Sequence, residues 1–373
     1  MSIDVEVLTQ DSDLRALRDD WNVLVREAPD TLIGQDATCT HEWFEALRTA
    51  FPEALQGCVI TARRYGRLIG LLPVHAGTPS RLGPTVTLTT VLYCGRVAPL
   101  MSEPDPAIWA ALLKGVDKAF PGWISMRMNF ESRCPATTVA LEESRRRGHA
   151  VQQAQHCESP FFPLFATAEE FKDGVSKSVL QMLRTARNKF AKLGPPIEFR
   201  EYLRPDQATE LLDLVLQVER HSWKHEAGTA ITAQPRQEAF YRTLFPHALE
   251  AGLLYAAALW QDGKPIAHIF GTVRDQVFCC LKHSHAADFD KLSPSYLLNE
   301  WVFGRLRDSG VLTFDFMGRS DPHKLRWSNR NGSYLCHEYR LFNRSPKARL
   351  TAFAIRSRAK LRPNPPEPAR DAG

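Results

Sequence analysis

One short segment concentrates side chains suited to acid–base chemistry: from Glu219 to His225 the sequence reads "ERHSWKH". It ends a helical pattern whose apolar stripe consists of Leu211, Leu214, Val215 and Val218. We expect a carboxylate beside that stripe to be partly buried, which would raise the pKa of Glu219 towards the range of a general base. Trp223, one turn further on, would line the pocket around Glu219. The competing interpretation is a structural glutamate paired with an arginine.

Two histidines end a strand-like segment, "VFCCLKHSH", which starts at Val277. Strand alternation predicts one face made of Val277, Cys279, Leu281, His283 and His285. Lys282 is then expected on the opposite face. Because imidazole titrates near neutral pH, His283 is a candidate base or orienting group. Structural histidines near the end of a strand are the alternative.

A second carboxylate, Asp315, interrupts the apolar segment "VLTFDFMG". A lone carboxylate inside a strand is costly, so we expect Asp315 to be paired or used in chemistry. The nearest basic residues are Lys324 and Arg326 in "DPHKLRW", a segment that ends in Trp327. A structural pair between Asp315 and Lys324 and a catalytic carboxylate are both compatible with this pattern.

An anion site is predicted where the segment "DKLSPSYLL" begins a helix. Ser293 suits the N-cap position and Pro294 the first helical position. The backbone N–H groups of the first turn, which includes Ser295 and Tyr296, have no partners within the helix. Together with the helix dipole they favour phosphate binding, although most helix starts bind only water.

Metal and nucleotide motifs are missing from the sequence. Four histidines could meet, namely His221, His225, His283 and His285, but no H-E-x-x-H motif or cysteine pair accompanies them, so no metal site is expected. The sequence also lacks a P-loop, a G-x-G-x-x-G turn and a G-x-S-x-G elbow. These absences argue against P-loop NTPases, Rossmann dehydrogenases and α/β-hydrolases.

Composition narrows the class further. The chain has 373 residues, 44% of them hydrophobic and 24% charged, which indicates a globular protein of two domains. Its net charge of +5 suits an anionic substrate but makes nucleic-acid binding unlikely. Eight cysteines without regular spacing indicate reduced thiols. With no export signal or membrane span in the pattern, we expect a cytoplasmic protein.

Two segments of the chain repeat one pattern. The hairpin pattern "CVITARRYGRLIGLLPVHAG" at Cys58 returns as "LYAAALWQDGKPIAHIFGTV" at Leu254. Each copy is followed by a proline-started apolar helix, a glycine and a strand. We therefore predict an α/β fold with domains at residues 1–158 and 159–344, and a basic, proline-rich and partly disordered tail at 345–373.

Basic residues suggest a peripheral membrane contact. The helix predicted between the two domains carries Lys177, Arg184, Arg187, Lys189 and Lys192. A solvated surface is the simpler interpretation, and attraction to phosphates or acidic lipids is the functional one. The tail would supply a second such contact, at the inner face of the membrane.

From Phe161 to Arg340 the order of motifs resembles the bacterial acyltransferases associated with cellulose biosynthesis, a branch of the GNAT superfamily, and also the Fem-type aminoacyltransferases with two GNAT units. The motifs are "SKSVLQMLRTARNKF", "ERHSWK", "DGKPIAHIF", "DFDKLSPSYLL", "FDFMG" and "HKLRW". The resemblance implies tandem GNAT-like domains, each with a mixed, mainly antiparallel sheet flanked by helices. The usual R-x-x-G-x-G/A loop is replaced by "DKLSPS".

The resemblance also implies an N-acyltransferase that moves an acyl group from acyl-CoA to a primary amine, without a bound cofactor. Ser293, Pro294, Ser295 and Tyr296 would hold the CoA, Glu219 or its rival His283 would be the base, and Asp315, Lys282, Lys324, Trp223 and Trp327 would shape the acceptor site. The acceptor would be an amino sugar, a polysaccharide precursor or a long-chain amino alcohol. An aminoacyl-tRNA-dependent transferase and a non-catalytic binding module are the alternatives.

Overall fold

The computed structural model describes residues 2–28, 37–78, 83–92 and 97–361. Its strands form one mixed sheet in the order β1-β2-β3-β4-β6-β13-β7-β12-β11-β10-β9-β8, with the short β5 (Leu100–Met101) beside β3. The first unit contains β1 (Asp4–Leu8), β2 (Cys58–Arg64), β3 (Arg67–Ala76), β4 (Thr85–Leu88) and β6 (Ser125–Glu131). The second unit contains β8 (Ile197–Tyr202), β9 (Leu254–Gln261), β10 (Lys264–Arg274), β11 (Val277–His285) and β12 (Thr313–Asp315).

The two units have the same strand order and the same strand directions. In each, three antiparallel pairings are followed by one parallel pairing, β4 with β6 and β11 with β12. The hairpins match in detail. In each, the turn begins with a left-handed residue, Tyr65 or Asp262, and the strand register shifts four residues later, at Ile69 or Ile266. The internal repeat predicted from the sequence is therefore confirmed, as is the mixed, mostly antiparallel fold.

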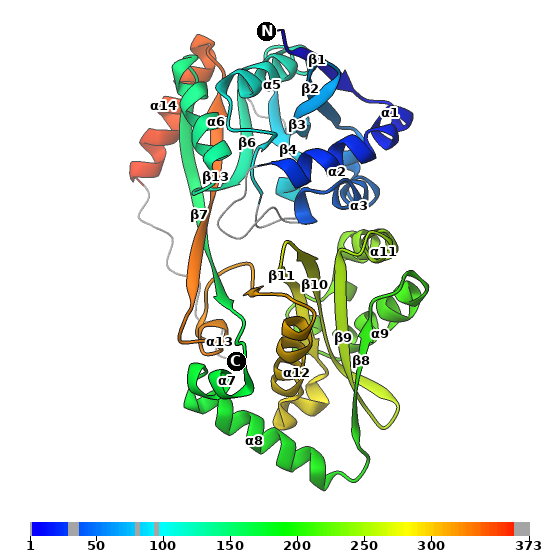
Figure 1. Ribbon diagram of the computed structural model, residues 1–373. Coiled ribbons are helices and arrows are strands. Elements are labelled where there is room, and N and C mark those ends of the chain that lie inside the picture. The colour runs from blue at the N-terminus through cyan, green and yellow to red at the C-terminus, as the bar shows by residue number, and fades with distance from the viewer. Residues whose placement is uncertain (1, 29–36, 79–82, 93–96, 362–373) are drawn as a thin grey trace.

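The last strand of each unit completes the sheet of the other. β7 (Ala150–Pro163) follows the first unit in the chain but pairs with β12 of the second, while β13 (Gly332–Phe342) pairs with β6 of the first. β13 also pairs with β7 along the whole of its own length. Figure 1 shows this long ribbon connecting the upper and lower units. Ser159, where the domain boundary is predicted, lies within β7.

Helices cover both units. The first unit has α1 (Asp11–Ala16), α2 (Arg18–Glu27), α3 (His41–Ala50), α4 (Pro52–Leu55), α5 (Pro106–Ala119) and α6 (Pro135–Arg146), with η1 (Ala37–Cys39) and η2 (Thr89–Leu92). The rest of the chain has α7 (Ala168–Gly174), α8 (Lys177–Lys192), α9 (Ala208–Arg220), α10 (Trp223–Glu226), α11 (Pro235–Glu250), α12 (Pro294–Asp308), α13 (Pro322–Leu325) and α14 (Pro346–Leu361), with η3 (Pro205–Gln207), η4 (Ile231–Ala233) and η5 (Ala287–Leu292).

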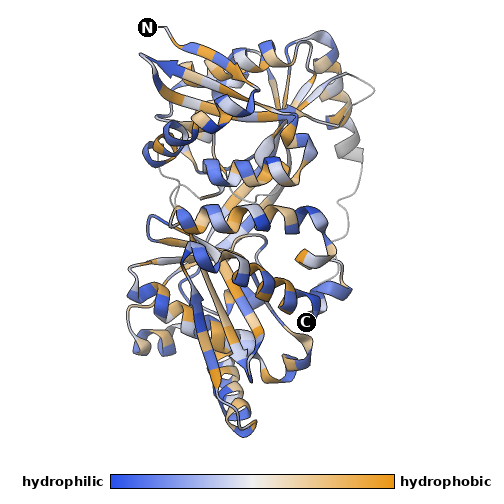
Figure 2. Cartoon of the chain, turned by 90° about the vertical axis from the view of Figure 1, so that its right-hand side faces the viewer, coloured by the Kyte–Doolittle hydropathy of each residue, from blue (hydrophilic) through white to orange (hydrophobic). Residues whose placement is uncertain are grey.

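The three largest hydrophobic clusters of the described residues form most of the interior. One fills the first unit, and the second packs α8 and α12 against the second unit's sheet. The third lies under α9 and α11 and includes Trp43 and Leu47 of α3, so helices of both units share a core. In the side view of Figure 2 the units again lie one above the other, with a helix of each at their boundary. No described helix is long and apolar enough to span a bilayer.

Candidate active site

The strand β11 does not alternate as predicted, because it contains a bulge. Gly271 pairs with Cys280 and Phe270 with Lys282, so Leu281 is the extra residue. One inserted residue exchanges the two faces of a strand beyond it. His283 consequently shares a face with Cys280, whereas Lys282 shares the face of Cys279. The predicted single face from Val277 to His285 is therefore wrong.

Beyond the bulge, β11 extends past its parallel partner. It pairs with β12 only from Val277 to Cys279, and continues to His285 beside β10. The chain then passes through η5 into α12, whose N-terminus follows this extension. Ser295 Oγ lies 2.7 Å from His285 Nδ1, and Asp290 Oδ1 lies 2.8 Å from His285 Nε2. These contacts join the end of β11 to the first turn of α12.

The start of α12 differs from the expected cap. Ser293 occupies the N-cap position, and Pro294 opens the helix as predicted. Ser293, however, has a left-handed backbone with φ 56°, and its side chain makes no capping hydrogen bond. Further into the turn, Tyr296 Oη accepts a hydrogen bond of 2.9 Å from Arg326.

Glu219 is fully buried at the end of α9. The backbone N–H of Ile231 donates to Oε2 at 3.0 Å, while His268 Nε2 and Lys224 Nζ lie 3.4 and 3.7 Å from Oε1. Burial by itself would raise the carboxyl pKa, but His268, Lys224 and the Ile231 N–H together lower the pKa of Glu219 to about 2. The expected rise is therefore wrong, because burial brought cationic and hydrogen-bonding partners with it.

His268 is the residue that the sequence analysis missed. It lies on β10, is 1% exposed, and faces Glu219. Burial, opposed by its contact with Glu219, lowers the pKa of the imidazole, so the ring is neutral at physiological pH. The available signal was the single polar residue in the apolar stretch "PIAHIF", which resembles the lone Asp315 in β12.

Three lysines and His283 form what we call the cationic cluster: Lys224, Lys282, Lys324 and His283. Lys224 donates a hydrogen bond to the carbonyl oxygen of His283, and Lys282 Nζ lies 3.5 Å from the carbonyl oxygen of Thr229. Burial and the charge of neighbouring Lys224 lower the pKa of Lys282, which Glu219 partly offsets. Lys224 is more strongly desolvated, and its pKa is also lowered.

His283 is exposed as a residue, although protein atoms surround its imidazole on most sides. That desolvation, followed by the positive charge of Lys224, lowers the pKa of His283 to about 3. The imidazole is therefore neutral, and its lone pair is available at physiological pH. The cluster as a whole carries positive charge and would attract an anion.

Asp315 is buried on β12 and satisfied by neighbours. It accepts hydrogen bonds from Tyr334 Oη at 2.9 Å and from the backbone N–H of Met317 at 2.7 Å. Lys324, its predicted partner, donates instead to the carbonyl oxygens of Met317 and Arg319 at 2.8 and 2.6 Å. Lys324 thereby fixes the loop that follows Asp315.

The two predicted tryptophans lie in different environments. Trp223 is 51% exposed at the start of α10, whereas Trp327 is 3% exposed and packs against Tyr296 and Phe303. Trp327 can thus support the first turns of α12 from behind. Among the described residues, no group of three or more His, Cys, Asp or Glu side chains could hold a metal ion.

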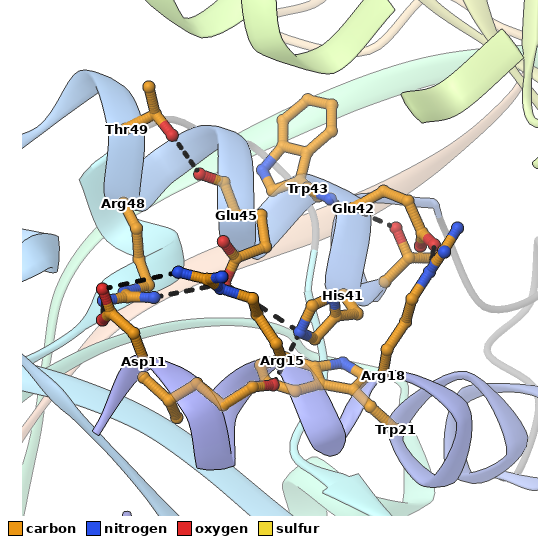
Figure 3. A network of polar contacts seen from close by, with 12 residues as sticks. Asp11, Arg15, Arg18, Trp21, His41, Glu42, Trp43, Glu45, Arg48 and Thr49 are labelled. Carbon is orange, nitrogen blue, oxygen red and sulfur yellow. Dashed lines mark hydrogen bonds and ion pairs between the residues drawn. The ribbon is translucent and has the colours of Figure 1, made fainter. Parts of the chain in front are cut away.

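A second polar network lies in the first unit, where α1 and α2 meet α3 (Figure 3). Arg18 Nε donates to Glu42 Oε1 at 2.9 Å, and His41 Nε2 lies 2.9 Å from the carbonyl oxygen of Leu14. Arg48 joins Asp11 at 2.5 Å. These bonds tie three helices together, so the buried charges of this network have structural partners.

A family profile described as acetyltransferase (GNAT) domain matches residues 177–325. That stretch holds Glu219, His268, the cationic cluster and the start of α12. A comparison with curated protein sequences gave no match.

Solved structures with the same fold include FemX, with TM-score 0.62 and 11% identity over 92% of this chain and 99% of that one. Another is the C-terminal domain of a putative lysylphosphatidylglycerol synthetase from Agrobacterium fabrum, with TM-score 0.53 and 13% identity over 92% and 96%. A third, L-PGS from Bacillus licheniformis, has TM-score 0.52 and 11% identity over 91% and 95%. At these identities the likeness concerns the fold alone. The site described above therefore lies within the stretch that matches the acetyltransferase (GNAT) profile.

Proposed function

We propose that this protein is an acyl-CoA-dependent N-acyltransferase that acylates a primary amine. The observation that carries the proposal is the extension of β11 past its parallel partner β12, with the first turn of α12 directly after it. The backbone N–H of Ser295 would bind the CoA phosphates, whereas that of Tyr296 already donates to the carbonyl oxygen of Ser293 at 3.2 Å. The cationic cluster would add attraction for the anionic donor. Ser293 and Pro294 set the direction of this turn.

In the proposed reaction the amine nitrogen attacks the thioester carbonyl carbon. A C–N bond forms, the C–S bond breaks, the CoA sulfur leaves as a thiolate, and the amine gives up a proton to a base. Backbone N–H groups of the β11 extension would donate to the developing oxyanion. Lys282, Lys324 and Asp315 would shape the acceptor site, with Trp223 at its exposed side and Trp327 behind it.

His283 is the better placed of the two candidate bases. Glu219 is fully buried, so no substrate can reach it directly. His283 is exposed and neutral. An anionic donor would offset the charges of Lys224 and Lys324, which removes part of the lowering of the His283 pKa, although desolvation is its largest cause. Glu219 then has a positioning role, because it pairs with Lys224, which donates a hydrogen bond to the carbonyl oxygen of His283.

For the acceptor we propose an amino sugar, a polysaccharide precursor or a long-chain amino alcohol such as a sphingoid base. The cellulose-associated branch of the superfamily stays a prediction. The named activity of the lysylphosphatidylglycerol synthetases, which share only the fold, makes aminoacyl transfer to a lipid the competing reaction. That alternative takes an aminoacyl-tRNA donor, whose binding depends strongly on salt.

The first test is thermal stabilisation by acetyl-, medium- and long-chain acyl-CoAs, with free CoA and tRNA as controls. Stabilisation by acyl-CoA supports the donor assignment, and growth with chain length indicates a lipid-sized acyl site. A shift from tRNA with none from any CoA contradicts it. Binding of acyl-CoA without transfer to any amine would indicate a binding module.

A second test separates the two bases. His283→Gln should lower kcat by about 10²- to 10⁴-fold, the usual effect of losing a general base. Because His283 is neutral above about pH 3 in the free protein, kcat/KM should show no histidine ionisation near neutral pH. Turnover of His283→Gln within a few-fold of the parent would contradict its role. If Glu219→Gln also stays within a few-fold, Glu219 is excluded as the base.

A further inference from the structure

The C-terminal helix α14 is held against the first unit by a narrow inner face. Ala348 and Ala352 are buried there against Ile124 and Phe342. Gln152 of β7 donates a hydrogen bond of 2.6 Å to the carbonyl oxygen of Ala352. The helix therefore has a fixed orientation, and its outer face is a defined surface of the folded protein.

That outer face carries two large apolar side chains in the open. Leu350 is 70% exposed and Phe353 is 71% exposed, and they lie one helical turn apart. Lys347 flanks them on one side of the helix, and Arg349 and Arg356 on the other. Exposed leucine and phenylalanine with cations on both flanks are typical of helices that lie in a membrane interface.

The neighbouring helix α6 enlarges the basic area. Side-chain atoms of Arg349 and Arg344 would lie 3.8 and 4.0 Å from a Cβ atom at Gly148, just after the end of α6. Arg145 in the last turn of α6 is exposed as well. Figure 1 shows α6 and α14 on the same flank of the upper unit.

Most of these cations have no carboxylate partner. Among the described residues, none of the cations Arg145, Arg344, Lys347, Arg349 and Arg356 forms an ion pair. The buried acid of α6, Glu143, is shared by Arg146 and Arg147. Glu142 is the one exposed acid of α6. We call these five cations, together with Leu350 and Phe353, the α14 face.

We propose that the α14 face docks on an anionic lipid surface, with Leu350 and Phe353 inserted among the headgroups and the five cations facing acidic lipids. Charge complementarity and the apolar centre favour lipid over nucleic acid, which would gain little from an exposed leucine and phenylalanine. The basic helix α8 fits less well, because Arg187 is paired with Glu300 and Lys189 donates to a backbone carbonyl. The proposal does not depend on acyl transfer.

The test is co-sedimentation of the full chain with vesicles of phosphatidylcholine alone or with about one-third phosphatidylglycerol. Each basic side chain near such a surface contributes about fivefold to binding. Two variants alter the face, Leu350→Ser with Phe353→Ser, and Lys347→Glu with Arg349→Glu. Matched controls lie elsewhere: Leu312→Ser, which is also exposed at 58%, and Arg184→Glu with Lys192→Glu on α8.

We expect the parent to bind the anionic vesicles only. Its affinity should fall at least tenfold in both α14 variants and stay unchanged in both controls. All four variants change exposed residues and should keep the thermal transition of the parent. The proposal is overturned if the parent does not sediment, if the α8 variant rather than the α14 variants loses binding, or if tRNA binds more tightly than vesicles. If the parent chain is a dimer in the absence of lipid, and Leu350→Ser with Phe353→Ser dissociates that dimer, the α14 face binds a second copy of the chain instead.

Discussion

The two units of the sheet share a topology but differ at the position where chemistry would occur. Aligned through their hairpins, His268 of the second unit corresponds to Leu71 of the first. Aligned through their parallel pairs, Asp315 corresponds to Arg127. The largest difference follows the parallel pair, since β4 ends at Leu88 and turns into η2, whereas β11 continues for five more residues.

This difference shows that the scaffold and the site are separable. In the first unit, residues such as Leu71, Leu88 and Trp43 line a mostly apolar cavity of only about 20 Å³. In the second, the bulge and the strand extension place Lys282 on the face of the sheet that carries His268, and His283 on the opposite face. One extended strand and a few polar substitutions thus distinguish a packing unit from a candidate catalytic one. The following experiments test that distinction.

The largest effect is expected from separating the units. Ending the chain after Asn331 removes β13, so β6 and β7 each lose one of their two neighbouring strands. We expect loss of the cooperative thermal transition, monitored by circular dichroism, since both halves of the sheet are broken. Residues 1–158 and 159–344 produced separately should be unstable for the same reason.

The control is a chain that ends after Leu361, which keeps β13 and α14. It should retain the transition of the parent. A sharp transition in the chain ended at Asn331, within a few degrees of the parent, would mean that each unit folds without its exchanged strand.

The second prediction compares buried acids of the two units. Glu219→Gln leaves Lys224 without its partner and should lower the free energy of unfolding by about 3 kcal/mol. Displacement of Lys224 and the His283 backbone should also reduce turnover by about 10- to 100-fold. Glu42→Gln weakens contacts with Arg18 and Asn22, so it should cost about 1.5 kcal/mol and leave turnover nearly unchanged. Chemical denaturation and steady-state rates measure both effects.

The pH dependence supplies the control. Because the pKa of Glu219 is about 2 in the folded protein and 4.5 ordinarily, the unfolded chain binds a proton first as the pH falls. The contribution of Glu219 to the free energy of unfolding is therefore fully present above pH 4.5 and is lost as the pH falls from 4.5 to 2. Glu219→Gln should reduce this decline. Equal loss of turnover in Glu42→Gln would contradict the assignment of function to the second unit.

The third prediction replaces a polar residue of the second unit with its counterpart from the first. In a double-mutant cycle of His268→Leu and Glu219→Gln, we expect a coupling of about 1 to 2 kcal/mol, since the two side chains are 3.4 Å apart and fully buried. Urea denaturation of the four proteins measures it. If the two changes in the free energy of unfolding add to within about 0.3 kcal/mol, His268 and Glu219 do not interact energetically.

The smallest effect concerns the hairpin turns. Tyr65 and Asp262 occupy equivalent left-handed positions, with φ 55° and 50°. Aspartate tolerates that conformation better than tyrosine. Tyr65→Asp should therefore stabilise the protein by about 0.5 to 1 kcal/mol, while Asp262→Tyr should destabilise it similarly. Thermal shifts of the same sign in both variants would contradict this equivalence.

Local features of the site could be predicted from the sequence, and long-range ones could not. The repeat, the helix that begins at Pro294 and the buried stripe before Glu219 follow from turn residues and periodicity, which depend on neighbours in the chain. The bulge at Leu281 depends on how β10 and β11 match in length. The low pKa of Glu219 depends on His268, which no spacing rule connects to it. The exchange of β7 and β13 has no local signal, since either sheet edge would accept either strand.

That exchange has a consequence for synthesis on the ribosome. Arg127 of β6 meets its partner Glu338 of β13 across 211 residues of sequence. The first unit therefore emerges with β6 as an open edge and keeps that edge until Gly332–Phe342 has been translated. A nascent chain of this kind needs protection from pairing with its neighbours on a polysome. Translation speed and chaperone supply should accordingly affect the yield of this protein more than its final stability would suggest.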